Sequence, residues 1–154
     1  NAPAIEATVQ RYSQAPIFYA QTQLDEVHVV ENTAVPGAPA QWLGRKVFAF
    51  CAIGNPAAFF EDVRHWGMEL VGQREFPDHH RYASDDATQI ESDACAAGAE
   101  ALLCTQKDIY NLQDVCFRNL PLYSCQISMR ISEPDRFWDT ILAIVTRKRQ
   151  ESER

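Results

Sequence analysis

The sequence has no long apolar run among its 154 residues. No segment approaches the roughly 20 consecutive apolar residues that a membrane-spanning helix requires, and no signal peptide opens the chain. We therefore expect this chain to be soluble. Any contact with a membrane is expected to occur at its surface or through residues outside this sequence.

Positive charge is also scarce, because 14 Lys and Arg residues face 21 Asp and Glu residues, giving a net charge of -7. Proteins that bind nucleic acid do so mainly through clustered Lys and Arg side chains, so this balance argues against nucleic acid as a partner. The one basic cluster, residues 147–149, is close to the carboxyl terminus and is followed by acidic residues. We interpret it as a solvated helix end that complements the helix dipole.

Paired cysteines are missing as well. The chain has five cysteines, an odd number, and none stands in a CxxC or CxH spacing. This pattern fits neither a zinc site nor a disulfide framework. Cys51 and Cys104 fall inside apolar, strand-like runs, so we expect reduced thiols in a protein core.

The clearest structural signal is a strand, helix and strand between residues 46 and 82. Residues 47–53 form an apolar run that is typical of a strand buried on both faces of a parallel sheet. Asn55 and Pro56 favour a helix start, because asparagine is a good N-cap and proline suits the first helical position. Residues 68–72 follow as a second strand, which predicts a right-handed βαβ unit.

The remaining pattern also alternates between strands and helices, which predicts a three-layer α/β/α domain with a mostly parallel sheet, preceded by a small β-hairpin linker. We expect Asn1 and Ala2 to be a remnant of tag removal, residues 3–41 to form an N-terminal arm, hairpin and linker, and residues 42–154 to form the α/β lobe. The other predicted elements are a short helix or arm over 4–15, a hairpin of 17–22 and 27–31, a loop over 32–41, a helix over 85–97 capped by Ser84, strands over 99–104 and 122–131, a short helix after 105–108, and a final helix from about 133–134.

A polar cluster of Asp78, His79 and His80 lies just past the end of the second predicted strand, close to Tyr82. In α/β folds, ligands bind outside the carboxyl ends of parallel strands. Such a cluster can bind a metal, shuttle a proton or contact a phosphate; alternatively, it is a surface loop without a role. Adjacent residues in an extended segment point in opposite directions, so at most one of the two histidines faces a given site.

Two other predicted strand ends carry candidate residues. Gly54 and Asn55 lie at a strand-to-helix turn, where free N–H groups can hold an anion, although helix capping alone explains the asparagine. Lys107 and Asp108 follow the third parallel strand. Lys107 could contact a phosphate and Asp108 could cap the following helix, or both could be solvated surface residues.

Four motifs follow one another along the chain: VFAFCAIGNP at 47–56, Phe59-Phe60, FPDHH-x-Tyr at 76–82, and Thr-x-Lys-Asp at 105–108. Taken in order, they resemble the carboxyl-terminal lobe of tetraacyldisaccharide 4′-kinase, the lipid A 4′-kinase of Gram-negative bacteria. The resemblance runs from about residue 17 to the final helix. It implies a two-lobed P-loop-type kinase at the cytoplasmic face of the inner membrane. The implied reaction moves the γ-phosphoryl group of MgATP to the 4′-hydroxyl of a lipid A disaccharide 1-phosphate, giving lipid IVA.

The resemblance also implies roles and partners. His79 would be catalytic and would pair with an Asp of the other lobe, whereas Asp78, His80 and Tyr82 would shape the loop or bind substrate. ATP and Mg²⁺ would be bound mainly by an amino-terminal P-loop lobe, which the hairpin would join to this lobe. The other implied partners are the lipid A disaccharide 1-phosphate and, through the parent protein, the membrane surface.

Two departures keep alternatives open. The phosphate-binding motif GxxxxGK[ST] is absent from the 154 residues, so we expect this chain alone not to turn over ATP. Gln106 stands where the family has Glu, which leaves a non-catalytic binding module as an alternative. A DHH-type metal-dependent phosphoesterase is a further alternative for residues 78–80, but such sites need several more Asp or His ligands.

Overall fold

A computed structural model describes residues 2–30, 39–112 and 115–152. Of the loop predicted over 32–41, residues 32–38 lie outside these ranges, and the short 3-10 helix η1 covers Pro39–Trp42. The described chain forms two compact units, one containing residues 2–22 and 129–152 and the other residues 23–128. Each unit is described by itself.

The larger unit is built on a five-stranded sheet with the order β1-β5-β4-β2-β3. Strands β3, β2, β4 and β5 run parallel to one another. The edge strand β1 is antiparallel to β5, because Val30 bonds to Leu122 whereas the earlier Asp25 contacts the later Ser128. The sheet is therefore mostly parallel, as predicted. The strands are β1 Ala20–Val29, β2 Lys46–Cys51, β3 Glu69–Glu75, β4 Ala101–Thr105 and β5 Leu122–Ile131.

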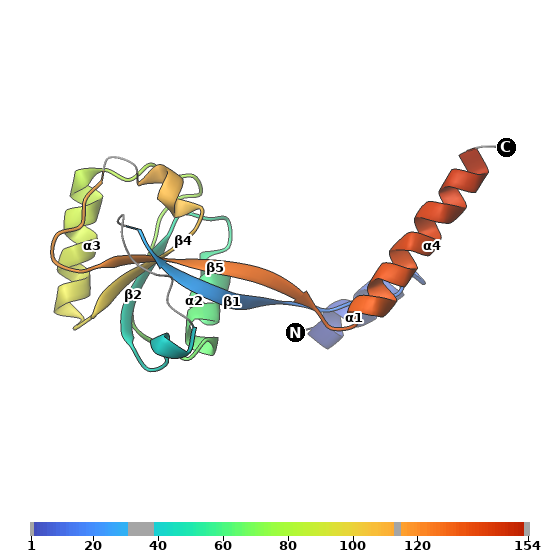
Figure 1. Ribbon diagram of the computed structural model, residues 1–154, viewed down its shortest axis with the longest axis horizontal. Helices are drawn as coiled ribbons and strands as arrows, with labels where there is room; N and C mark the ends of the chain where they lie inside the picture. Colours follow the sequence, from blue (N-terminus) through green and yellow to red (C-terminus); the bar gives the residue numbers. More distant parts are fainter. Residues whose placement is uncertain (1, 31–38, 113–114, 153–154) are drawn as a thin grey trace. The chain divides into compact units, whose positions relative to one another are not determined.

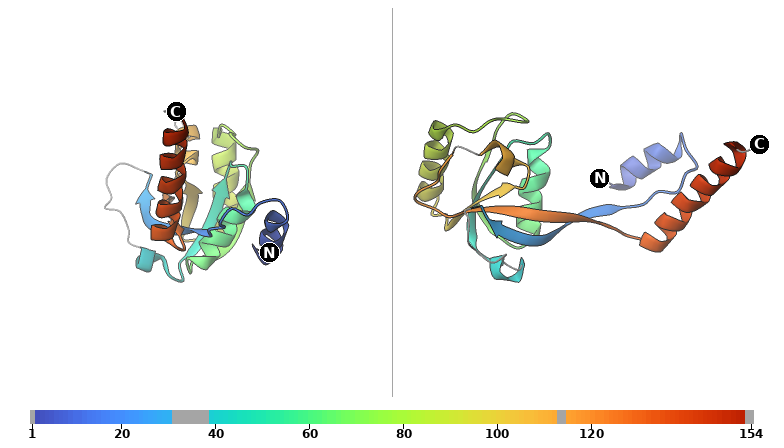
Figure 2. Two further views of the ribbon diagram at one scale, coloured as in Figure 1. Left: turned by 90° about the vertical axis from the view of Figure 1, so that its right-hand side faces the viewer. Right: turned by 45° about the horizontal axis from the view of Figure 1, so that its top comes forward.

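Helices cover both faces of this sheet. Helix α2, Pro56–His65, packs on one face and helix α3, Ser84–Ala96, packs on the other (Figure 1). The side chains of β2 alternate between the two faces. Val47 packs in the core that contains Phe60 of α2, and Phe48 packs in the core that contains Ile90 of α3. The right-hand view of Figure 2 shows the strands between the two helices, which confirms the three-layer prediction.

The helix starts follow from local side-chain chemistry. Asn55 is the N-cap of α2, where its Oδ1 accepts a hydrogen bond from the N–H of Ala58 at 3.4 Å. The prediction that Ser84 caps the next helix was wrong, because Ala83 holds the N-cap position of α3. The carboxylate of Asp86 accepts the N–H of Ala83 at 2.8 Å, so an acidic side chain in the first turn satisfies the backbone instead.

The predicted hairpin at residues 17–31 was also wrong, because residues 20–29 form the single strand β1. Residues of the predicted turn and of the predicted second strand both pair across the sheet. Asp25 accepts a hydrogen bond from Ser128, which is 103 residues away in the sequence, and His28 contacts Gln126 at 2.9 Å. A partner at that separation leaves no local pattern, so the charged residues between the two apolar runs predict a turn from sequence alone.

The smaller unit contains α1, Ala2–Gln10, and α4, Pro134–Ser152. The ring of Phe18 packs edge-on against Phe137 at 5.3 Å and lies under the guanidinium of Arg136 at 5.5 Å. Helix α4 exposes large apolar side chains at positions 138, 141, 142, 144 and 145, and those at 138, 141, 142 and 145 recur at helical spacing. Across the described residues, none of the helices combines the length and apolar character needed to cross a membrane.

All five cysteines are free thiols. Cys51, Cys104 and Cys125 are buried in the larger unit, whereas Cys95 and Cys116 are exposed. Burial, followed by the nearby carboxylate of Asp108, raises the pKa of Cys51 to about 12, so this thiol stays protonated at neutral pH. The expectation of reduced core thiols agrees with these positions.

Candidate functional site

The candidate site lies where the parallel strands β2, β3 and β4 end. These three strands are neighbours, so their carboxyl ends meet at one edge of the sheet. The loop that follows β3 is tied to the end of β2 by two backbone hydrogen bonds. The N–H of Phe76 donates to Cys51 O at 2.9 Å, and the N–H of His79 donates to Ala52 O at 3.2 Å.

His79 occupies a tight turn in this loop. The N–H of His80 donates to Pro77 O at 3.0 Å, which closes a four-residue turn with His79 in its third position. The backbone of His79 has φ of 60°, and among the described residues no other non-glycine residue has positive φ. Turns with positive φ at the third position usually place glycine or asparagine there. The His79 side chain is 90% exposed, so the turn presents its imidazole to solvent.

Two candidates from different segments meet beside this turn. A β-carbon placed on Gly54 would lie 3.7 Å from Oδ2 of Asp78, so the two residues are close neighbours. The same Asp78 oxygen lies 3.8 Å from Nε2 of His79. Asn55, by contrast, uses its side chain to cap α2. Gly54, Asp78 and His79 therefore lie close together at the ends of β2 and β3.

His80 has different surroundings from His79. Its ring stacks on Phe76, with centroids 4.8 Å apart and an angle of 20° between the planes. Its Nε2 lies 2.9 Å from Oδ2 of Asp86, and its side chain is only 29% exposed. His80 thereby connects the loop to the first turn of α3, a loop-shaping arrangement.

The Asp86 carboxyl is held in its ionised form by these neighbours. Partial burial by itself would raise its pKa, but the hydrogen bonds from Ala83 and His80, together with the charge of Arg74, hold the pKa below its ordinary value. One carboxylate thus serves both the start of α3 and the loop that carries His79.

Asp108 lies in the interior, with 1% of its surface exposed, so the prediction of a solvated residue was wrong. Its Oδ1 accepts the N–H of Ala52 and the hydroxyl of Tyr82, each at 2.8 Å. Its Oδ2 accepts the N–H of Thr105 at 3.1 Å and the Thr105 hydroxyl. Asp108 also does not cap the helix that follows, the 3-10 helix η2 (Asp108–Asn111), whose N-cap is Lys107. Its bonds run back toward the strand ends.

The other candidates near Asp108 divide between core and surface. Tyr82 is 7% exposed, and burial, with the carboxylate of Asp108 as the second cause, raises the pKa of its hydroxyl far above the ordinary value. The phenol therefore stays protonated and donates to Asp108. Lys107 and Gln106 are exposed, and neither takes part in the hydrogen bonds described for Asp108.

Sequence reasoning missed Ala52 and Thr105. Ala52 contributes only its backbone, which leaves no trace in the residue type. Thr105 stands three residues before Asp108, and such a pair of hydroxyl and carboxylate residues is a known turn pattern that could have drawn attention to it.

The described residues do not fit a metal ion. Across residues 2–30, 39–112 and 115–152, no group of three or more His, Cys, Asp or Glu side chains lies close enough to hold one. A DHH-type phosphoesterase site needs such a group, so residues 78–80 do not favour that alternative. We assign neither Mg²⁺ nor a nucleotide to these residues.

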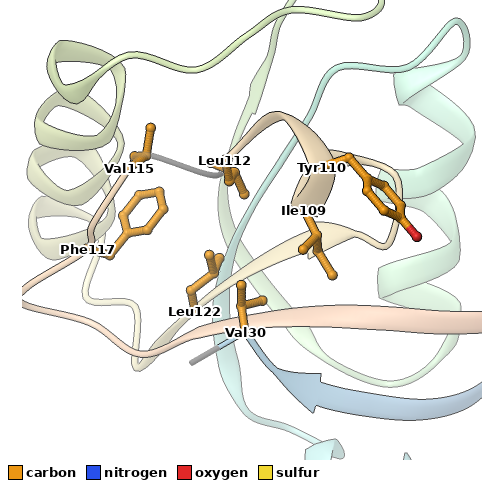
Figure 3. Close-up of a pocket in the computed structure, with 7 residues that line it drawn as sticks. All are labelled: Val30, Ile109, Tyr110, Leu112, Val115, Phe117 and Leu122. Atoms are coloured by element: carbon orange, nitrogen blue, oxygen red, sulfur yellow. The ribbon is translucent and has the colours of Figure 1, made fainter. Parts of the chain in front are cut away.

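A pocket of about 350 Å³ lies beside η2 (Figure 3). The side chains that line it are apolar apart from the hydroxyl of Tyr110, which points away from the other labelled side chains. Chemistry requires polar or titratable groups, so we do not include this pocket in the candidate site. The lining residues are Val30, Ile109, Tyr110, Leu112, Val115, Phe117 and Leu122.

The fold and the strand-end loops define a three-layer α/β domain of the class that gathers functional groups at the carboxyl edge of a parallel sheet. A family model described as tetraacyldisaccharide-1-P 4′-kinase, LpxK, matches residues 1–146. The chain therefore belongs to the tetraacyldisaccharide 4′-kinase family.

Individual relatives carry the same name. A tetraacyldisaccharide 4′-kinase of Koribacter versatilis is 36% identical over 103 residues, covering 67% of this chain and 32% of the relative. One from Bradyrhizobium sp. (strain BTAi1) is 33% identical over 134 residues, covering 84% and 36%. A crystal structure of LpxK from Aquifex aeolicus in complex with ATP has a TM-score of 0.46 and 15% identity, covering 86% of this chain and 38% of that one. The chain spans about a third of the length of these relatives.

Proposed function

We propose that this chain is the carboxyl-terminal part of a tetraacyldisaccharide 4′-kinase and contributes His79 to its active site. The reaction transfers the γ-phosphoryl group of ATP to the 4′-hydroxyl of the lipid A disaccharide 1-phosphate precursor, giving lipid IVA. Membership of the family supports the reaction class. When bound by the amino-terminal lobe, ATP supplies the phosphoryl group and Mg²⁺ neutralises the negative charge that develops on it during transfer.

The backbone of His79 is the observation that carries this proposal. A residue with a β-carbon loses about 1–2 kcal/mol in the left-handed region, where His79 has φ of 60°. Such strained positions persist where the surrounding structure holds them and are concentrated at functional sites. Here the strained turn presents an imidazole to solvent at the edge of the sheet where the parallel strands end.

An exposed imidazole at this position suits the proton step of phosphoryl transfer. Histidine is the side chain whose ordinary pKa lies closest to neutral, so its neutral form can accept a proton from the attacking hydroxyl. In the proposed reaction the 4′-oxygen bonds to the γ-phosphorus while the bond from that phosphorus to the bridging oxygen of ADP breaks. The hydroxyl proton passes to His79. A carboxylate of the amino-terminal lobe would stabilise the resulting imidazolium, and Asp78 already lies 3.8 Å from the ring.

The exposed apolar face of helix α4 supports the proposal that this chain has an amino-terminal lobe as its partner. Its apolar side chains at positions 138, 141, 142 and 145 lie on one helical face and are 39–60% exposed. Apolar stripes of this kind on a helix are normally covered by another protein surface. We propose that the amino-terminal lobe of the parent protein covers it, and that the parent acts at the cytoplasmic face of the inner membrane.

The test is phosphoryl transfer by the complete parent protein carrying His79→Ala. We expect kcat to fall by about 10² or more, the loss typical of a removed general base. His65→Ala is the matched control, because His65 is an exposed histidine at the end of α2. A fall of less than about threefold for His79→Ala would refute the catalytic role. A complete wild-type protein that binds the disaccharide but transfers no phosphate would favour a non-catalytic binding module.

A further inference from the structure

We propose that the buried carboxylate of Asp108 is a positioning residue for His79 and acts through the backbone of Ala52. This inference rests on the proposed catalytic role of His79. It assigns Asp108 a function in the reaction although its side chain is shielded from any substrate.

The connection runs through both backbone groups of Ala52. Oδ1 of Asp108 accepts the N–H of Ala52 at 2.8 Å, and the carbonyl of Ala52 accepts the N–H of His79 at 3.2 Å. Ala52 is 5% exposed and directly follows β2, so the residue that joins the two bonds is itself buried. A shift of Ala52 that lengthens the first bond therefore displaces the acceptor of the second.

The carboxylate itself is held from three directions. Ala52 comes from the end of β2, Tyr82 from the loop after β3, and Thr105 from the end of β4. A buried carboxylate with four donors is a strong and well-defined acceptor, whereas a neutral amide could not accept at both positions. Asp108 thus fixes the end of β2, the end of β4 and the loop after β3 relative to one another.

The bond to Ala52 ties the turn of His79 to the core. Of the hydrogen bonds described for its turn, the bond between His80 and Pro77 is local, whereas the bond to Ala52 reaches the core. With φ of 60°, His79 has a more favourable alternative at negative φ once that bond weakens. The change would swing the imidazole away from its place. A displacement of about 1 Å can cost a catalytic group about 10² in rate.

The first arm of the test is nuclear magnetic resonance of this 154-residue chain, which needs no activity. In the wild type, His79 should show the strong intraresidue HN–Hα Overhauser effect of a positive φ and a protected amide. Asp108→Asn should weaken that effect and speed exchange of the His79 amide by about tenfold or more. If Asp108→Asn does not fold, Asp108→Glu, which keeps the charge but moves it by one methylene, is judged by the same criteria.

Glu91→Gln is the matched control. Glu91 is also a buried carboxylate, 6% exposed, and it accepts the N–H groups of Arg118 and Asn119 at 2.6 Å. Its substitution removes a comparable charge from the interior without touching the bonds of Ala52. The His79 signature should stay unchanged in Glu91→Gln. An unchanged signature in a folded Asp108 variant would overturn the proposal.

The second arm measures phosphoryl transfer by the complete parent protein. Asp108→Asn should lower kcat by about tenfold or more with little change in KM for ATP, and Glu91→Gln should not. In the His79→Ala background, Asp108→Asn should cause no further loss, because the group it positions is gone. Losses that multiply would overturn the positioning role. If His79→Ala alone has no effect on kcat, the proposed function fails, and the magnetic resonance arm still decides whether Asp108 positions His79.

Discussion

The hydroxyl of Tyr82 lies 2.8 Å from Oδ1 of Asp108, and both side chains are buried. The ring of Tyr82 also packs edge-on against Phe50 of β2, with centroids 5.4 Å apart. The last residue of the FPDHH-x-Tyr motif is therefore anchored in the core both by its ring and by its hydroxyl. Its neighbour two positions earlier, His80, contacts the same ring at 5.3 Å, so the anchor extends into the loop.

We expect Tyr82→Phe to lower the free energy of unfolding by about 1–2 kcal/mol, because it removes one donor from a buried carboxylate and keeps the ring. The measurement is urea denaturation of this chain followed by circular dichroism. Tyr110→Phe is the control, since Tyr110 is 74% exposed and its loss of a hydroxyl should change stability by less than about 0.5 kcal/mol. Equal effects of the two substitutions would contradict the role of the buried hydrogen bond.

A second prediction concerns acid stability and Asp86. Its pKa in the folded protein is lower than its ordinary value of 3.8. The unfolded chain therefore binds the proton more readily, and the stabilisation from ionised Asp86 is present above that ordinary pKa and is lost as the pH falls through the folded value. Asp86→Asn should remove this part of the acid dependence.

The measurement is the urea midpoint of wild type and variant across the acid range. The stability difference between them should be constant above the ordinary carboxyl pKa and should shrink as the pH falls below it. Asp85→Asn, at an exposed position in the same helical turn, serves as the control and should keep the acid dependence of the wild type. A difference that grows toward low pH would contradict the inferred sign.

The fold was predictable where the signals were local. The apolar run of β2, the cap at Asn55 and the proline at the first position of α2 are neighbours in sequence, and the βαβ unit follows from them. Strand β5 was predicted with the correct bounds, Leu122–Ile131. Strand β1 was not predicted as one strand, because its partner residues lie about a hundred positions away and its central residues are charged.

The sequence predicted which edge of the sheet holds the candidate residues, but it did not predict which of these residues are buried. Parallel strands end at one edge, so Gly54, Asp78 and Asp108 could be assigned to the same part of the molecule. The sequence could not reveal that Asp108 lies inside with four donors, since an aspartate after a strand is usually a surface residue. Nor could it reveal that the backbone of Ala52 connects Asp108 to His79.

The backbone of His79 leads to a third prediction, on stability and activity together. Glycine adopts positive φ without steric cost, whereas alanine does not, so His79→Gly should be more stable than His79→Ala by about 1 kcal/mol. The opposite order is expected at Gln89, an exposed position in the interior of α3, where glycine is less stable than alanine by about 1 kcal/mol. Urea denaturation of the four variants of this chain measures both differences.

Phosphoryl transfer by the complete parent protein then separates the contribution of the His79 backbone conformation to activity from that of its imidazole. If the imidazole carries the chemistry, His79→Gly and His79→Ala should be equally impaired, although one relieves the strain at positive φ and the other retains it. Alanine as stable as glycine at residue 79 would mean that this position does not hold positive φ in solution. Activity that follows the stability order would instead assign the functional requirement to the turn, and His79 would lose its role as the proton acceptor.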